Sequence, residues 1–126
     1  MEDVGAHAHN PNDDYPAYIH AAAQKVLQSS ADAIGIIFGG SGQGEAIVAN
    51  RYPGIRAMVY PAPNPDLITL GREHNNANIL SIGARFVSRE EAVAAVNLFI
   101  TTPFPAEERH ARRIGQIDKE LSLIHI

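Results

Sequence analysis

The chain has no cysteine and no tryptophan, and aromatic residues make up only 6% of its 126 residues. Without cysteine it can form neither a disulfide nor a thiolate metal site, which fits a reducing compartment. No apolar run approaches the roughly 20 residues that a membrane-spanning helix needs. The acidic start Met1-Glu2-Asp3 does not resemble a secretory signal. We therefore expect a cytoplasmic protein that has no membrane partner.

Positive charge is also scarce. Ten Lys and Arg residues stand against 14 Asp and Glu residues, which gives a formal net charge of −4. Such a chain has no general attraction for nucleic acid. Its apolar content of 45% is ordinary for a globular protein, and its length suits a single core. The composition predicts one globular domain without a nucleic-acid partner.

Apolar runs of strand length alternate with segments of helical periodicity. The run Ala33–Phe38 predicts a strand buried on both faces, and Ile55–Tyr60 and Ile79–Gly83 predict two more strands. Helices are predicted at 15–28, 46–51, 66–73, 89–100 and 107–121. The first helix has Asp13 or Asp14 as its expected cap. This alternation predicts an α/β fold with a parallel sheet and helices on both faces.

Four glycines are concentrated in the segment Gly39–Glu45, between the first strand and the next helix. Such a loop can turn tightly and direct its N–H groups at an anion, assisted by the positive end of the following helix. Ser41 adds a hydroxyl group and Glu45 adds a candidate base. Since ligands bind at the carboxyl ends of parallel strands, the segment is a candidate active-site loop.

The loop does not match the common phosphate and nucleophile motifs. No Lys-Ser/Thr pair follows Gly44, as a Walker A motif would need. A dinucleotide site would need other glycine spacing and an acidic residue where Tyr60 ends the next strand. Gln43 stands where a G-x-S-x-G elbow needs glycine. His7 and His9 are close in sequence but belong to no closed ligand set, so we predict no metal site.

Two further segments concentrate polar groups. Arg72–Asn78 precedes a predicted strand, although His74 alone would be explained as a helix-end histidine whose cation the helix dipole favours. Arg109 and Arg113 are spaced to share one helical face, and two guanidinium groups suit a phosphate. By themselves, the two arginines would more often form a solvated basic face.

Together these segments closely resemble the ribose-5-phosphate isomerase B family, which includes the galactose-6-phosphate isomerase subunits. The matching stretches, in family order, are Asp13–Pro16, Gly39–Glu45, Ala49–Arg51, Gly54–Ala57, Arg72–Asn78, Gly83–Arg85 and Arg109–Arg113. The resemblance implies a Rossmann-like three-layer α/β/α sandwich that uses no metal and no cofactor. It also implies a homodimer, with a tetramer as the alternative, whose active sites lie between subunits.

The activity that the resemblance implies is the interconversion of ribose 5-phosphate and ribulose 5-phosphate in the pentose phosphate pathway. This reaction removes a proton beside a carbonyl group and passes through an enediolate. Serine is a weak base without an activating partner, so we assign Glu45 as the base and Ser41 to proton handling or substrate positioning. One alternative is an isomerase of allose or galactose 6-phosphate or of a tetrose phosphate. Another is a non-catalytic sugar-phosphate-binding subunit of a dimer.

The resemblance also implies roles for the other polar groups. The backbone N–H groups of Gly42 and Gly44 would stabilise the enediolate oxygen. His74 would assist ring opening, and Asn75 would bind a substrate hydroxyl or the enediolate. Further substrate contacts are expected from Gly40, Gln43 and Tyr15, and phosphate contacts from Arg109, Arg113, His110 and Arg85. Of these residues, His74, Asn75 and Arg85 are expected to serve the site of the partner subunit.

Both ends of the chain differ from the family pattern. Family members begin with a strand that ends in an Asp-His pair and then a helix, so we expect Met1–Val4 to belong to a second strand. We expect residues 1–120 to form one domain that lacks its first strand and helix and is inactive alone. Isomerase activity of the purified chain would contradict that expectation. Residues 121–126 have no family counterpart and are expected to be a non-native tail.

Overall fold

The computed structural model describes residues 1–124, with side chains as far as Lys119. The strands are β1 (Gly35–Gly39), β2 (Ala57–Val59) and β3 (Ile79–Gly83). The helices are α1 (Pro16–Gln28), α2 (Gln43–Ala49), α3 (Asp66–Asn75), α4 (Arg89–Thr101) and α5 (Glu108–Ile124). Strand β3 lies between β1 and β2 and is parallel to both. The carboxyl ends of all three strands therefore lie at one edge of the sheet.

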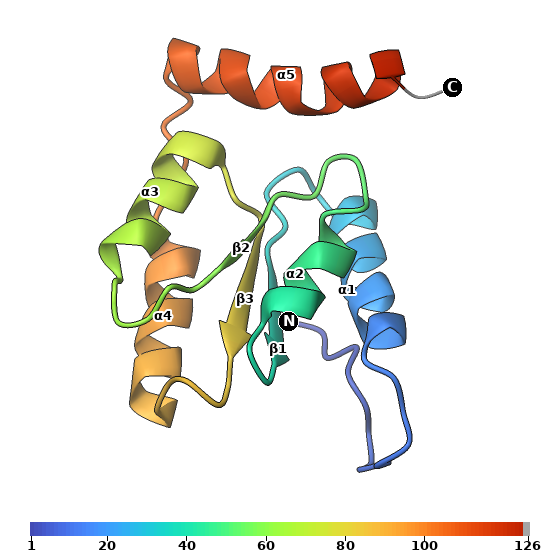
Figure 1. The fold of residues 1–126 in the computed structure, drawn as a ribbon. Coiled ribbons are helices and arrows are strands. Elements are labelled where there is room, and N and C mark those ends of the chain that lie inside the picture. The colour runs from blue at the N-terminus through green and yellow to red at the C-terminus, as the bar shows by residue number, and fades with distance from the viewer. Residues whose placement is uncertain (125–126) are drawn as a thin grey trace.

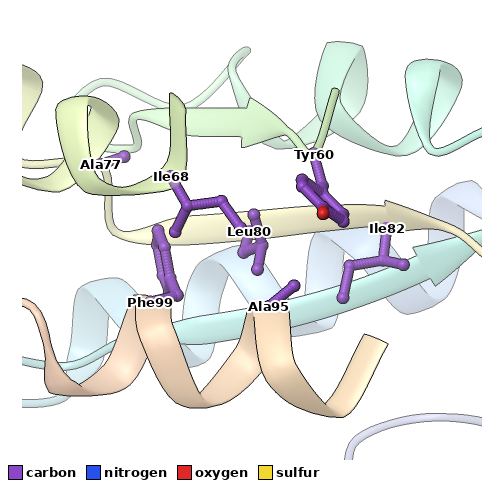
Figure 2. Packing of buried hydrophobic residues seen from close by; sticks show 7 residues of the cluster. All are labelled: Tyr60, Ile68, Ala77, Leu80, Ile82, Ala95 and Phe99. Atoms are coloured by element: carbon purple, nitrogen blue, oxygen red, sulfur yellow. The ribbon is translucent and has the colours of Figure 1, made fainter. Parts of the chain in front are cut away.

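Helices cover both faces of the sheet, as the alternation of the sequence predicted (Figure 1). On one face, α3 and α4 pack against β3 through Tyr60, Ile68, Ala77, Leu80, Ile82, Ala95 and Phe99 (Figure 2). On the other face, α1 and α2 enclose a cluster of Ile19, Ala23, Ile37, Ala49, Ile55 and Ile79. The three-layer α/β/α sandwich is thus confirmed, because each face of the sheet buries its own apolar cluster.

The three strands and five helices predicted from residue 15 onward are present, with shifts in their bounds. β3 has the predicted bounds, whereas α2 begins at Gln43 and so takes Glu45 into its first turn. The predicted cap of α1 is wrong, because Tyr15 occupies the cap position and makes no side-chain capping bond. Asp13 is engaged elsewhere, since its Oδ2 accepts a hydrogen bond from the Tyr18 hydroxyl at 3.2 Å.

Strand β1 is not buried on both faces, so that expectation is wrong. Ile37 is buried, but the side chain of Phe38 is 54% exposed. β1 pairs with β3 alone and is an edge strand. The strand expected at Met1–Val4 is also not formed. A strand needs a neighbour for its N–H and C=O groups. The contacts described for this segment are an ion pair of Glu2 with Lys25 at 3.1 Å and a hydrogen bond from the N–H of Gly5 to Oδ1 of Asp3 at 2.9 Å.

Helix α5 crosses the amino end of the sheet and packs against α3 (Figure 1). It continues to Ile124, past the predicted end at residue 121. Residues 125–126 lie outside the described part, and the expected non-native origin of 121–126 stays a prediction. None of the helices in the described part is long and apolar enough to cross a membrane.

Candidate active site

The glycine loop leaves β1 at the carboxyl edge of the sheet and is fastened to the end of β3. The N–H of Arg85 donates to the carbonyl of Gly40 at 3.2 Å, and Ser81 Oγ donates to the carbonyl of Gly42 at 2.7 Å. Gly42 has a φ of 80°, in the left-handed region that glycine enters without a steric penalty. Main-chain contacts therefore fix the path of the loop.

Glu45 lies at this end of the sheet, in the first turn of α2, and is only 7% exposed. A Cβ atom built on Gly39 would lie 2.1 Å from Cδ of Glu45 and 2.2 Å from both of its carboxylate oxygens. The carboxylate therefore packs directly against the Gly39 backbone. Among the described residues it has no hydrogen-bond or ion-pair partner. Its oxygens keep contact with solvent, so a carboxylate in this position is a candidate base.

Backbone N–H groups lie at the same end of α2. The N–H of Gly44 is one of the first four of the helix, which find no partner inside it. The N–H of Gly42 makes no backbone hydrogen bond within residues 1–124. Ser41 Oγ accepts a hydrogen bond from the N–H of Gln43 at 3.2 Å. The helix dipole adds positive potential, so this end can stabilise an oxyanion.

Tyr15 and Arg85 also lie beside the loop. A Cβ atom built on Gly44 would lie 2.3 Å from the Tyr15 hydroxyl oxygen, and one on Gly40 would lie 3.3 Å from Cζ and Nε of Arg85. Arg85 thus contacts the loop of its own chain, whereas the resemblance implied the partner's site. A neighbouring cavity of about 640 Å³ is lined by residues that include Ser41, Gln43, Tyr60 and Phe86. That volume is within the usual range for small-molecule sites.

The remaining candidate residues lie at the opposite end of the sheet (Figure 1). Helix α3 ends at Asn75, shortly before β3 begins at Ile79, whereas the loop is level with Gly83 at the other end of β3. Four residue steps along β3 separate the level of Ile79 from the level of Gly83, a distance of about 13 Å. A single chain therefore does not bring its glycine loop and its His74 into one site.

His74 and His110 form a stacked pair. Their ring centroids are 4.2 Å apart, and the ring planes differ by 14°. His110 is 5% exposed, and its buried Nε2 has no hydrogen-bond partner, although Oε2 of Glu107 lies 3.5 Å away. Burial lowers the pKa of His110, as do the charges of His74, Arg109 and Arg113, against an opposing effect of Glu107.

Arg109 and Arg113 are exposed on α5, and Asn75 is exposed at the end of α3. Neither arginine has a hydrogen bond or ion pair within the described part of the chain. Arg112 differs, because its Nη1 donates to Oε1 and Oε2 of Glu108 at 3.0 and 2.8 Å. Two unpaired guanidinium groups are thus available for an anion. Among the side chains that the structure describes, those of residues 1–119, no group of three His, Asp or Glu is placed to hold a metal ion.

Sequence reasoning missed two arginines that shape the end of α3. Arg72 is 8% exposed and donates from Nε to the carbonyl of Thr102 at 2.9 Å and from Nη1 to Asn76 Oδ1 at 3.1 Å. Arg56 Nε donates to the carbonyl of Asn76 at 2.9 Å. These bonds hold the turn that follows His74. Arg72 lies in the segment Arg72–Asn78, which the sequence singled out. Its bond to Thr102, at the end of α4, depends on tertiary packing and could not be predicted from the sequence.

Comparison with known proteins identifies the family. A family profile described as Ribose/Galactose Isomerase matches residues 1–117. The chain belongs to this isomerase family. One curated member is the ribose-5-phosphate isomerase B of Mycolicibacterium paratuberculosis. It is 45% identical to the chain over 112 residues, which make up 89% of this chain and 69% of that relative.

Solved structures of the ribose/galactose isomerase family share the fold. The ribose 5-phosphate isomerase of Thermotoga maritima matches with a TM-score of 0.83 and 42% identity, covering 94% of this chain and 78% of that one. The enzyme of Mycoplasma genitalium, solved with bound ribulose-5-phosphate, matches with a TM-score of 0.87 and 33% identity. That match covers 95% of this chain and 77% of the other. These matches confirm the predicted Rossmann-like fold.

Proposed function

We propose that the chain is an aldose–ketose isomerase that interconverts ribose 5-phosphate and ribulose 5-phosphate. Its membership of the ribose/galactose isomerase family supports this proposal, as do the relatives that carry the name ribose-5-phosphate isomerase B. The observation that carries it is the Glu45 carboxylate, which is buried against Gly39 and unpaired at the N-terminus of α2. A base and a set of N–H donors are what an enediolate reaction requires.

In the proposed reaction, Glu45 takes the proton from the carbon beside the carbonyl group. The electron pair of the broken C–H bond forms the C=C bond of the enediolate, and negative charge moves to the carbonyl oxygen. The N–H groups of Gly42 and Gly44 donate to that oxygen, and loss of one such donor costs about 3 kcal/mol in comparable sites. Glu45 then returns the proton to the other carbon. The Ser41 hydroxyl passes a proton between the two oxygens.

Each site is proposed to form between two copies of the chain. One copy supplies the glycine loop, with Gly40, Gln43, Tyr15 and Arg85 beside the sugar. The partner supplies His74 for ring opening, Asn75 for a hydroxyl group, and Arg109 and Arg113 for the phosphate. The separation of about 13 Å between the two ends of one chain supports this arrangement, because neither end holds a complete set of groups.

Glu45→Gln tests the proposed base, with turnover of this and of every other variant measured in a longer form of the protein that also contains the expected first strand and helix. The substitution keeps the size of the side chain but cannot accept the proton, so turnover should fall by about 10²- to 10⁴-fold. Binding of ribose 5-phosphate, measured by calorimetry, should persist. Glu90→Gln, at the exposed start of α4, is the matched control and should behave as the unsubstituted chain. Unchanged turnover in Glu45→Gln would exclude Glu45 as the base.

A second candidate substrate is a hexose phosphate, because the description of the matching family names galactose as well as ribose. Parallel assays with ribose 5-phosphate, allose 6-phosphate and galactose 6-phosphate separate these substrates. The proposal expects the highest kcat/KM for the pentose phosphate. Binding of all three without turnover would instead support the non-catalytic subunit.

A further inference from the structure

His110 is placed differently from the two arginines that share its helix turn. Arg109 and Arg113 are exposed, whereas the side chain of His110 is turned toward α3 and is only 5% exposed. At about 100° per residue, His110 lies about 100° from Arg109 and about 60° from Arg113 around the helix, so spacing alone does not separate the three side chains. Burial separates them, because Nε2 of His110 is closed off from solvent in this arrangement and a phosphate on the exposed arginines does not reach it.

The contact that His110 does make is with the ring of His74. The two imidazoles lie nearly parallel, with centroids 4.2 Å apart. His74 belongs to the last turn of α3, whose following turn is fixed by Arg72 and Arg56. Stacking on one face limits rotation of the His74 ring while its edge nitrogens stay free. Ring orientation matters because proton transfer needs a nitrogen within hydrogen-bond reach of the substrate.

The surroundings of His110 favour its neutral form. Burial lowers the pKa of His110, and the charges of His74, Arg109 and Arg113 act in the same direction, against an opposing effect of Glu107. The buried Nε2 makes no hydrogen bond, although Oε2 of Glu107 lies 3.5 Å away. A neutral His110 ring can stack on the His74 ring without repulsion between two cations.

We infer that His110 is a positioning residue, whose ring holds the His74 imidazole in place for ring opening of the sugar phosphate. This inference rests on the proposed function. It gives His110 a role other than the phosphate contact expected from the resemblance.

Two substitutions separate the roles. His110→Phe keeps a flat ring in the same space but cannot titrate, and His110→Ala removes the ring. Turnover should stay within about threefold of the unsubstituted chain for His110→Phe and fall by about tenfold or more for His110→Ala. The Kd of inorganic phosphate should be unchanged in both variants. Arg113→Ala is the comparison in which that Kd rises.

The NMR signals of the His74 ring protons provide a readout that does not depend on turnover. Stacking on an aromatic ring shifts these signals, so they should stay near their position in His110→Phe and move in His110→Ala. The inference is overturned if the signals move equally in both variants. It is equally overturned if His110→Phe raises the Kd of inorganic phosphate as much as Arg113→Ala. Failure of the proposed reaction would appear separately, as unchanged turnover in Glu45→Gln.

Discussion

The two ends of the sheet hold their candidate groups in different ways. At the carboxyl end, Glu45 is buried and packed against the backbone of Gly39, in a loop fastened to β3. At the amino end, Asn75, Arg109 and Arg113 are exposed on the ends of helices. The chain alone thus fixes the position of the proposed base. The candidate groups at the amino end are left available to a ligand or to a second copy.

Gly39→Ala acts at the carboxyl end of the sheet and should have the largest effect on turnover. The new Cβ would lie 2.1 to 2.2 Å from the carboxylate atoms of Glu45, so the carboxylate must move. Since a misplacement of about 1 Å can cost about 10²-fold in rate, we expect turnover to fall about a hundredfold. The Kd of inorganic phosphate should not change. Initial rates and calorimetry measure the two quantities.

Gly115→Ala is the matched control at the other end of the molecule. Gly115 lies within α5, and a Cβ atom built on it meets nothing within 4 Å. Activity should be unchanged, and the free energy of unfolding should rise by about 0.5–1 kcal/mol because alanine favours the helix. Equal losses of activity in both variants would contradict the special packing at Gly39.

Arg113→Ala acts at the amino end of the sheet and should weaken binding of the sugar phosphate. A hydrogen bond to a charged group contributes about 1.5–3 kcal/mol, so the Kd of ribose 5-phosphate should rise about tenfold or more. Arg112→Ala is the control, because Arg112 is paired with Glu108 and an exposed pair of this kind contributes under about 1 kcal/mol. A similar rise in both variants would indicate that general positive charge, and not a specific site, holds the phosphate.

The smallest effect expected is on stability at mildly acidic pH. Folding lowers the pKa of His110 from about 6.5, mainly through burial, so folding favours its neutral form. The part of the free energy of unfolding that depends on a neutral His110 is fully present above pH 6.5. It is lost as the pH falls from there through the lower pKa of the folded state. As the pH is lowered from 8 to 5, the melting temperature should therefore fall more steeply for the unsubstituted chain than for His110→Phe. Parallel curves would contradict a buried neutral His110.

The local elements could be predicted from the sequence because their signals are local. β3 is a short apolar run that ends in glycine, and its predicted bounds are those observed. The start of α2 was missed because Gln43 and Gly44 look like loop residues. They become helical because the helix begins at a left-handed Gly42. Sequence periodicity does not report such a start.

Tertiary relations were the part that could not be predicted. The exposure of Phe38 depends on which strands flank β1, and the sequence of β1 does not contain that information. The burial of His110 depends on α5 docking against α3. Arg85 reaches the loop of its own chain because its N–H donates to the carbonyl of Gly40 just after the end of β3. Candidate residues could therefore be selected from the sequence, and their roles stay a prediction, but their distribution over the two ends of the sheet could not be predicted.

A cross-linking experiment tests the division of the site between two copies most directly. Because the chain has no cysteine, Ser41→Cys in one copy and Asn75→Cys in another introduce the only thiols. A thiol cross-linker shorter than the separation of about 13 Å cannot join these positions within one chain. The account predicts covalent dimers in a mixture of the two variants. Absence of such dimers, or cross-linking within single chains that carry both substitutions, would contradict it.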